Sequence, residues 1–178
     1  MFDNDYIITG KHASYLKALA RTPNDNEETA KNKIFERYID VYMNAAVWGL
    51  ISSRKVKRNK DIDDTASILA AVFYKERETC IFLYRLVILI DGKDLNDKER
   101  IDRAFHYDMM PEKSEQFKQN MEIFNDYVRG GIEEMYETFI HECHTRSDYL
   151  NKIYEVMIKF KDEIDNAFFE DEVEKLIN

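Results

Sequence analysis

Residues 34–49 read IFERYIDVYMNAAVWG, and the spacing of their apolar side chains indicates the fold class. Apolar and small residues recur at steps of three and four, the pattern of an amphipathic α-helix: Ile34, Tyr38, Val41, Tyr42, Ala45, Trp48 and Gly49. We expect one long helix here, from about residue 27 to residue 52. The neighbouring small residues Ala45 and Ala46 would let a second helix approach closely, because the distance between packed helices depends on the side chains at their contact.

Most of the chain repeats this period, so helices are expected almost throughout. Residues 11–21 predict one helix, and residues 61–64 begin another with acidic side chains in its first turn, as the helix dipole favours. The charged run at 75–78 is either a solvated turn of one long helix or a junction between two. Residues 80–90 are apolar on nearly all sides, which is typical of the central helix of a bundle, with a buried strand as the alternative. A short strand is expected at residues 7–8.

Capping residues locate several helix ends. Asn26, Asn96 and Ser147 each precede a helical stretch and suit the N-cap position. Glu99 follows Asn96 at the spacing of a capping box. These residues therefore predict helices that begin near 27, 97 and 148.

Gly130 and Gly131 lie inside the helical stretch that begins near Pro111. Two glycines in mid-helix cost about 2 kcal/mol relative to alanine. A kink, a break in the helix, or a close backbone contact with another element would each explain why they are there.

The composition agrees with an all-α fold in a single domain. The 178 residues suit one domain with a true core, and 44% of them are hydrophobic. Five glycines and two prolines are too few for the tight turns of a β-sandwich or barrel. We therefore expect a multi-helix bundle of roughly six to eight helices over residues 1–178, with an acidic, frayed tail at about 168–178.

Nothing in the sequence predicts export, a membrane span or a bound cofactor. The N-terminus, MFDNDYIITG, has neither the cationic start nor the long apolar segment of a signal peptide. The most apolar run, at 80–90, is shorter than the about 20 residues that a bilayer requires. Two cysteines, Cys80 and Cys143, cannot form a disulfide framework. We expect a cytoplasmic protein that needs no cofactor.

One cluster has the donor atoms of a metal site. The stretch ETFIHECH at 137–144 places Glu137, His141 and His144 at i, i+4 and i+7 of an expected helix, with Cys143 beside them. Such donors suit zinc or iron. A closed zinc site needs four ligands, a diiron bundle needs repeated Glu-x-x-His elements, and neither pattern is visible. The histidines also have a structural explanation, because cations near a helix C-terminus complement its dipole.

A second candidate site is the basic stretch SRKVKRNK at 53–60. Its cations stand in a chain whose formal net charge is −9: Arg54, Lys55, Lys57, Arg58 and Lys60. They could contact the phosphates of a nucleic acid, dock on a protein partner, or form a solvated helix exit whose removal costs about 1 kcal/mol or less. The pI of about 5.0 argues against general binding to nucleic acid, and no aromatic residue lies between the cations to stack on bases.

Two stretches resemble a known family. FERYIDVYMNAAVWGLISSRK (35–55) resembles the first long helix of small bacterial proteins found beside DNA phosphorothioation (dnd) genes. YVRGGIEEMYE (127–137) is similar to a second family feature, a Gly-Gly pair that opens a late helix. The matching positions are Phe35, Ala45, Ala46, Gly49, Arg54, Lys55, Gly130 and Gly131. The resemblance implies an accessory component in bacterial DNA modification or phage defence, and it assigns no chemistry to particular residues.

Three hypotheses about function follow. The first is a non-enzymatic helical accessory protein that acts through contacts with a protein partner. The second is a nucleic-acid-binding module that uses the basic stretch. The third is a metal-dependent enzyme centred on Glu137, His141 and His144. None of them requires a membrane, and the oligomeric state stays open.

Overall fold

Helices dominate the structure, as the sequence predicts. The computed structural model describes the backbone of residues 1–177 except 32, 60–62, 142 and 144, and the side chains of the same residues apart from 28, 111, 163, 164 and 166–177. Helices take up 68% of the described residues. Within that part of the chain, none of the helices combines the length and the apolar character that crossing a bilayer requires.

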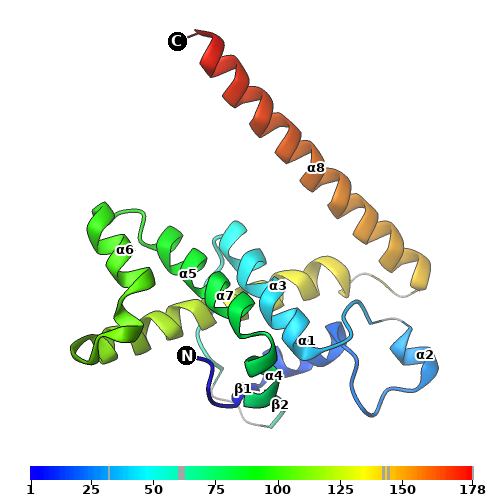
Figure 1. The fold of residues 1–178 in the computed structure, drawn as a ribbon. Helices are drawn as coiled ribbons and strands as arrows, with labels where there is room; N and C mark the ends of the chain where they lie inside the picture. The colour runs from blue at the N-terminus through cyan, green and yellow to red at the C-terminus, as the bar shows by residue number, and fades with distance from the viewer. Residues whose placement is uncertain (32, 60–62, 142, 144, 178) are drawn as a thin grey trace.

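The elements follow one another as a helical body with a small sheet and a final extended helix (Figure 1). The strands β1 and β2 span Tyr6–Thr9 and Thr65–Ile68. The helices are α1 (Lys11–Leu19), α2 (Glu27–Ala30), α3 (Tyr38–Ile51), α4 (Ala70–Lys75), α5 (Arg77–Asp91), α6 (Asp97–Phe105), α7 (Ser114–Phe139) and α8 (Arg146–Ile177), with 3-10 turns at Tyr107–Met109 and Pro111–Lys113. The end of α4 and the start of α5 make the charged run at 75–78 a junction between two helices.

The expected helix from 27 to 52 is wrong in its first half. The Asn26 side chain does cap a helix, accepting from Thr29 N at 2.8 Å, but α2 ends at Ala30 and α3 begins only at Tyr38. Between them the chain pairs with the end of α1: Phe35 N donates to Leu19 O at 3.0 Å. Backbone groups committed to this bridge cannot also form helical hydrogen bonds, so the helical period is interrupted.

A helix was also expected to begin at 61–64. Residues 61 and 62 lie outside the described residues, and the expectation is wrong for residues 65–68, which form a strand. β2 pairs antiparallel with β1, with Ile68 opposite Tyr6 and Thr65 opposite Thr9. Its residues alternate between exposed and buried, and Ala66 and Ile68 face the core. Residues two apart share one face in a strand but not in a helix. The strand expected at residues 7–8 is confirmed by β1.

At the centre of the body α3 and α7 cross closely, and glycine residues lie at their contact. A Cβ placed on Gly131 would lie 1.9 Å from Ala45 O, and one placed on Gly49 would lie 2.1 Å from Tyr127 O. α7 runs through Gly130 and Gly131 without interruption. The glycine pair therefore makes a close backbone contact and not a break in the helix, and Ala45 is the small residue at that contact.

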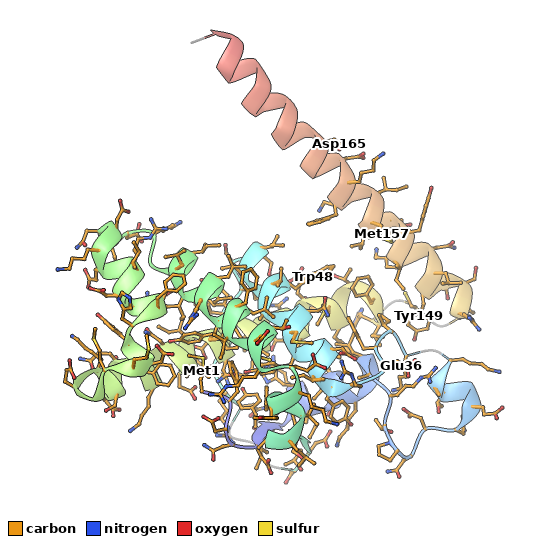
Figure 2. All side chains as sticks on the ribbon, in the orientation of Figure 1. Met1, Glu36, Trp48, Tyr149, Met157 and Asp165 are labelled. Atoms are coloured by element: carbon orange, nitrogen blue, oxygen red, sulfur yellow. The ribbon has the colours of Figure 1, made fainter. Side chains whose placement is uncertain are left out.

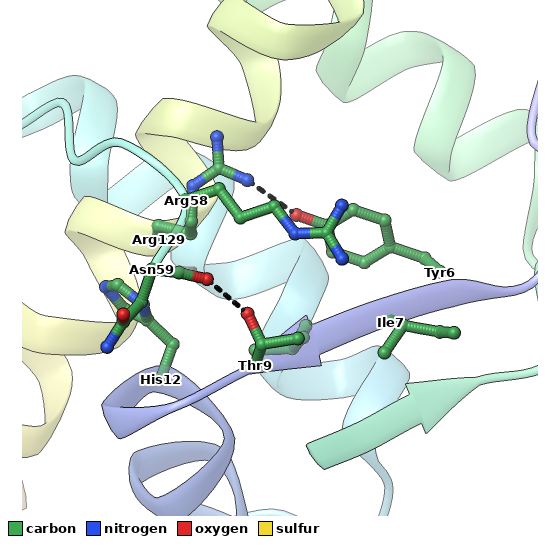
Figure 3. A pocket seen from close by; sticks show the side chains of 8 residues that line it. Tyr6, Ile7, Thr9, His12, Arg58, Asn59 and Arg129 are labelled. Atoms are coloured by element: carbon green, nitrogen blue, oxygen red, sulfur yellow. Dashed lines mark hydrogen bonds between the residues drawn. The ribbon is translucent and has the colours of Figure 1, made fainter. Parts of the chain in front are cut away.

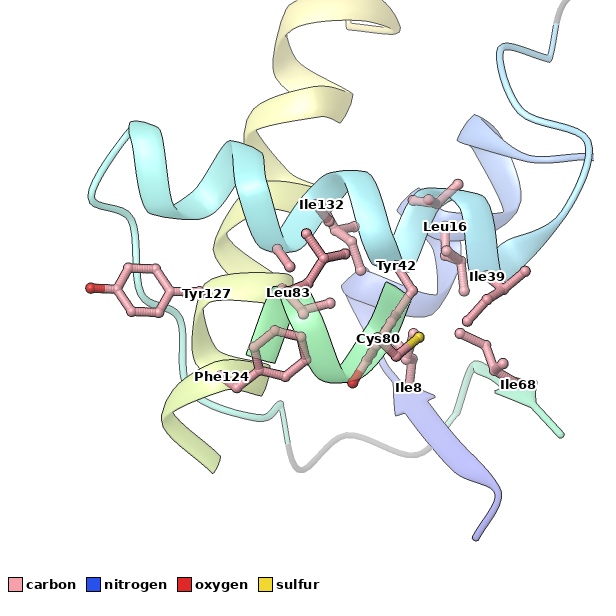
Figure 4. Close-up of a cluster of buried hydrophobic side chains, with 14 of the residues drawn as sticks. Ile8, Leu16, Ile39, Tyr42, Ile68, Cys80, Leu83, Phe124, Tyr127 and Ile132 are labelled. Atoms are coloured by element: carbon pink, nitrogen blue, oxygen red, sulfur yellow. The ribbon is translucent and has the colours of Figure 1, made fainter. Parts of the chain in front are cut away.

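Around this crossing, side chains from both strands and from α1, α3, α5 and α7 share one core (Figure 4). Tyr42 and Phe124 pack edge to face, with ring centroids 5.9 Å apart. The buried Tyr42 hydroxyl donates to Asn125 Oδ1 at 2.9 Å, so its polar end is satisfied inside the core. The labelled members are Ile8, Leu16, Ile39, Tyr42, Ile68, Cys80, Leu83, Phe124, Tyr127 and Ile132.

Residues 80–90 are helical, as expected, but α5 is not the central helix. Leu83 and Val87 are buried, whereas Phe82 is 63% and Ile90 is 42% exposed. α7 takes the central place, since it packs against α1, α3, α5 and α8. One side of a helix that is apolar all round is therefore left uncovered.

The last helix, α8, begins next to α7 and then extends away from the body (Figure 1). Its cap is Thr145 and not the predicted Ser147: Asp148 N donates to Thr145 Oγ1 at 3.3 Å, and Thr145 N donates to Asp148 Oδ2 at 2.7 Å. The cap predicted at Asn96 is confirmed, since its side chain accepts from Glu99 N at 3.0 Å. The frayed tail at 168–178 stays a prediction.

We expect Gly131→Ala to destabilise the protein by about 2–3 kcal/mol, although alanine is the better helix former by about 1 kcal/mol. The added methyl group would collide with a backbone oxygen, and backbone cannot move aside cheaply. The matched control is Gly92→Ala, where the nearest atoms are side-chain atoms 3.4 Å away. It should change the free energy of unfolding in urea by less than about 1 kcal/mol. Equal effects of the two substitutions would contradict the close crossing.

Candidate functional site

The basic stretch is held against α7 by its backbone. Arg54 N donates to Gly49 O at 2.9 Å, and Val56 N donates to Asp126 O at 2.9 Å. The Arg129 Nε then donates to Val56 O, also at 2.9 Å. Residues 54–59 are therefore tied to α7 by their backbone, while Lys55, Lys57 and Arg58 are exposed to solvent.

Gly130 explains how the basic stretch comes so close to α7. A Cβ placed on Gly130 would lie 1.9 Å from Arg54 O. Gly131 faces α3 in the same way, so the adjacent glycines admit two different backbones on two sides of α7. The basic stretch therefore contacts α7 next to the place where α7 crosses α3.

The Arg54 guanidinium binds three carboxylates of α7. It lies 2.7 Å from Glu133, 2.8 Å from Glu134 and 2.6 Å from Glu137. The Arg54 side chain is only 30% exposed. The expectation of a solvated charge is therefore wrong for this residue.

Two more cations of the stretch are paired inside the chain. Lys55 forms an ion pair with Asp91, and Lys57 forms one with Asp126. Both carboxylates are buried, with 8% and 2% of the side chain exposed. Burial opposes the ionisation of Asp91, but its hydrogen bonds from Lys55 and Arg103 outweigh it and lower the pKa of that carboxyl. Lys60 lies outside the described residues.

Glu133 joins the basic stretch to α1. Its carboxylate contacts Arg54, Lys11 at 2.5 Å, and the buried His12 ring through Nε2 at 2.9 Å. Burial opposes ionisation of Glu133, yet Lys11, His12 and Arg54 together lower its pKa. Burial also lowers the pKa of His12, against the raising effect of Glu133.

A small cavity lies beside this cluster (Figure 3). Its volume is about 10 Å³, room for one water molecule. Arg129 donates to the Tyr6 hydroxyl at 3.0 Å, and the Thr9 hydroxyl donates to Asn59 O at 2.6 Å. Arg58 lines the same cavity. The fourth cation of the stretch therefore lies at a small cavity between β1, α1 and α7.

Two of the predicted metal ligands, Glu137 and His141, do not share a helix face. α7 ends at Phe139, so His141 lies beyond the helix that was expected to carry it. Glu137 binds Arg54 through both carboxylate oxygens, at 2.6 and 2.8 Å, and Cys143 is buried. His144 is outside the described residues. Within the described part of the chain, no group of three or more His, Cys, Asp or Glu side chains is placed to hold a metal ion.

The acidic partners of the basic stretch were not singled out from the sequence. A usable signal was present, since Glu133, Glu134 and Glu137 follow the glycine pair within two helical turns and lie on adjacent faces. These three acids are natural partners for the cations of the basic stretch. For His12 the sequence offers no comparable signal, because its partner lies 121 residues away.

Over residues 11–174 the chain matches the family described as DNA sulphur modification system-associated protein 4. The chain belongs to this family. The match covers both stretches that carry the resemblance to dnd-associated proteins, and it confirms that resemblance. No curated protein and no solved structure matches the chain significantly. In this member of the DNA sulphur modification system-associated protein 4 family, the resembling stretches are the two helices that cross at the glycines and the basic segment clamped beside them.

We expect Arg54→Gln to lower the free energy of unfolding by about 2 kcal/mol, because it leaves the buried Glu133 with fewer charged hydrogen-bond donors. The control is Arg21→Gln. Arg21 pairs with Glu36 at 2.9 Å, but the two side chains are 45% and 67% exposed, so its loss should cost about 1 kcal/mol or less. Urea unfolding of both variants measures the difference. If Arg54→Gln lowers the free energy of unfolding no more than Arg21→Gln does, Arg54 behaves as a solvated surface charge and the structural role is contradicted.

The unfolding free energy should also decrease in acid, in two steps. The folded-state pKa of His12 lies below its usual 6.5, so the stability that depends on its neutral form is lost as pH falls below about 6.5. The lowered pKa of Glu133 adds stability that is lost only below about 4.5. His12→Gln should flatten the first step in urea titrations between pH 7 and 5. A first step that His12→Gln leaves unchanged would contradict the assignment.

Proposed function

We propose that this protein is a non-enzymatic accessory component of a bacterial DNA sulphur modification system, and of the phage defence it supports. In this proposal it acts in the cytoplasm and binds another protein of the same system through the uncovered side of α5. Membership of a family associated with DNA sulphur modification supports the setting. The surface of α5 supports the mode of action.

The observation that carries the proposal is an apolar helix with one bare side. Phe82, Leu86 and Ile90 stand at i, i+4 and i+8 of α5, and Phe82 and Ile90 are 63% and 42% exposed while Leu86 is half-buried. Residues at this spacing form one stripe along a helix. Apolar stripes of this kind are usually covered, and exposed apolar patches tend to mark protein contacts.

Features of the interior support a role without catalysis. In the small cavity the Thr9 hydroxyl donates to a backbone oxygen and not to the His12 ring, so these two do not form a nucleophile and base pair. Burial raises the pKa of the Cys80 thiol to about 12, which keeps it from forming a reactive thiolate near neutral pH. An open hollow of about 430 Å³ is lined by consecutive residues 74–79 at the α4–α5 junction, whereas catalytic sites usually gather residues from separate elements.

The basic stretch supports protein binding over nucleic-acid binding. Arg54, Lys55 and Lys57 each pair with carboxylates of the same chain. A phosphate would have to compete with these carboxylates, and the counterion release that drives binding to DNA would be reduced accordingly. We assign the paired cations a structural role, in which they tie the segment after α3 to α7 and α5.

The test is capture of the other proteins of the same modification gene cluster by the tagged full-length chain. We expect one of them to bind, and Phe82→Asp with Ile90→Asp to weaken that binding at least about tenfold, since both side chains would sit in a desolvated contact. Ile7→Thr is the matched control, because Ile7 is 50% exposed on β1 and lies outside the stripe. Circular dichroism verifies that each variant is folded.

Two results would overturn the proposal. One is capture that is unchanged by the two α5 substitutions. The other is binding to labelled duplex DNA with a log–log salt slope of about −4 to −5, as five phosphate contacts would give, that is lost when Lys55, Arg58 and Lys60 are replaced by Gln. That second result would establish the nucleic-acid alternative.

A further inference from the structure

The extended helix α8 carries apolar side chains on a side that no described residue covers. Leu150, Tyr154 and Met157 stand at i, i+4 and i+7, and they are 57%, 66% and 66% exposed. The other side of the first turns packs on the body, where Ile153 and Val156 contact the core. The helix therefore has two apolar sides, and the body uses one of them.

Beyond the body, α8 is bare all round. Every residue with a described side chain from Met157 to Asp165 is exposed. Figure 2 labels Met157 and Asp165 on the part of the helix that has left the body. Ile158 and Phe160 add to the apolar surface there, at 42% and 51% exposed. The helix has 32 residues, a length of about 48 Å, so most of it is available for contact.

The charge of α8 changes sign along its length. Residues 146–161 contain four basic side chains and two acidic ones: Arg146, Lys152, Lys159 and Lys161 against Asp148 and Glu155. Residues 162–178 contain seven acidic side chains and one basic one: Asp162, Glu163, Asp165, Glu170, Asp171, Glu172 and Glu174 against Lys175. The change falls between Lys161 and Asp162, close to the middle of the helix.

We infer that two copies of this chain pair through α8 in antiparallel orientation. In that arrangement the basic half of each helix lies along the acidic half of the other, and the point of sign change lies on the twofold axis. The same patch then serves both copies, as a twofold interface requires. Parallel pairing would place two acidic halves side by side, which like charges disfavour.

The apolar side chains fit the same arrangement. The bare stripe of Leu150, Tyr154 and Met157 reaches the point of sign change, and the sequence continues it at the helical positions of Ile164 and Phe168. A twofold axis near residues 161–162 brings the first part of this stripe onto the second part of the partner's stripe. Burial of both parts supplies the attraction, and the opposed charges select the orientation.

An anionic membrane surface fits α8 less well than a second copy. Helices that lie on such membranes carry basic side chains along their polar face. The second half of α8 carries seven acidic residues and would be repelled by the same lipids that attract the first half. The inference concerns α8 alone and goes beyond the proposed function, which uses α5.

Sedimentation equilibrium of the purified full-length chain, with no other component present, tests the pairing. We expect a dimer, and we expect Met157→Asp with Phe160→Asp to raise its dissociation constant at least about tenfold. Met109→Asp is the matched control, because Met109 is 68% exposed on the 3-10 turn after α6. A monomer at about 100 μM, well above the micromolar range of ordinary specific contacts, or a dimer insensitive to the two substitutions, would overturn the inference.

Charge exchange tests the orientation. Lys152, Lys159 and Lys161 changed to Glu make both halves of α8 acidic, and Asp162, Glu163 and Asp165 changed to Lys remove the net negative charge of its second half. Each variant alone should be monomeric, and the mixture should form a heterodimer. In the wild-type background, a bismaleimide should link Asn151→Cys to Glu172→Cys on the other copy. Linkage of Asn151→Cys chiefly to itself would show parallel pairing and refute the antiparallel arrangement. Failure of any of these tests leaves the α5 capture experiment unaffected, so the two accounts are separable.

Discussion

The rest of the structure depends on the approach of α3 to α7 at three glycines. Gly49 and Gly131 let the two helix backbones meet directly, and Gly130 admits the carbonyl of Arg54 on a second side of α7. Protein interiors are packed too densely to absorb an extra methyl group at such a place. The crossing sets where the core lies, and it draws the segment after α3 back along α7 instead of releasing it into solvent.

That constraint explains the charge distribution. A stretch with five cations is brought onto a helix that carries Asp126, Glu133, Glu134 and Glu137. The first cations of the stretch form ion pairs within the chain. The buried Glu133 extends this network from Arg54 to His12 on α1. The exposed apolar surfaces lie elsewhere, on the uncovered side of α5 and the bare side of α8. Two separate apolar surfaces agree with the proposed accessory role.

Much of the helical architecture could be predicted from the sequence, because a 3.6-residue period is a local property. The helices predicted at 11–21 and 80–90 follow from it, and the capping-box spacing of Asn96 and Glu99 predicted the helix that begins near 97. The bridge at Phe35 and the strand β2 could not be predicted, since each depends on hydrogen bonds to a distant segment that local propensity does not report. The prediction that residues 80–90 form the central helix is wrong for the same reason. The sequence shows that these residues are apolar, but it does not show which side of the helix another element covers.

The candidate site was predictable only in part. The glycine pair correctly indicated a close backbone contact, and the basic stretch was correctly singled out as unusual for an acidic chain. Its neutralisation by α7 was missed, because the contacts span roughly 70 to 80 residues of sequence. The metal hypothesis assumed that the helix continued to residue 144, whereas α7 ends at Phe139. Because His144 lies outside the described residues, the metal site stays a prediction.

Native-state hydrogen exchange, followed residue by residue, tests the central claim most directly. If the glycine crossing organises the fold, the amides of residues 128–132 in α7 and 45–49 in α3 should exchange only through global unfolding, at the free energy measured by urea. The amides of the short exposed helix α2 should exchange through local opening at far lower free energy. Amides at Gly130 and Gly131 that exchange as readily as those of α2 would contradict the account.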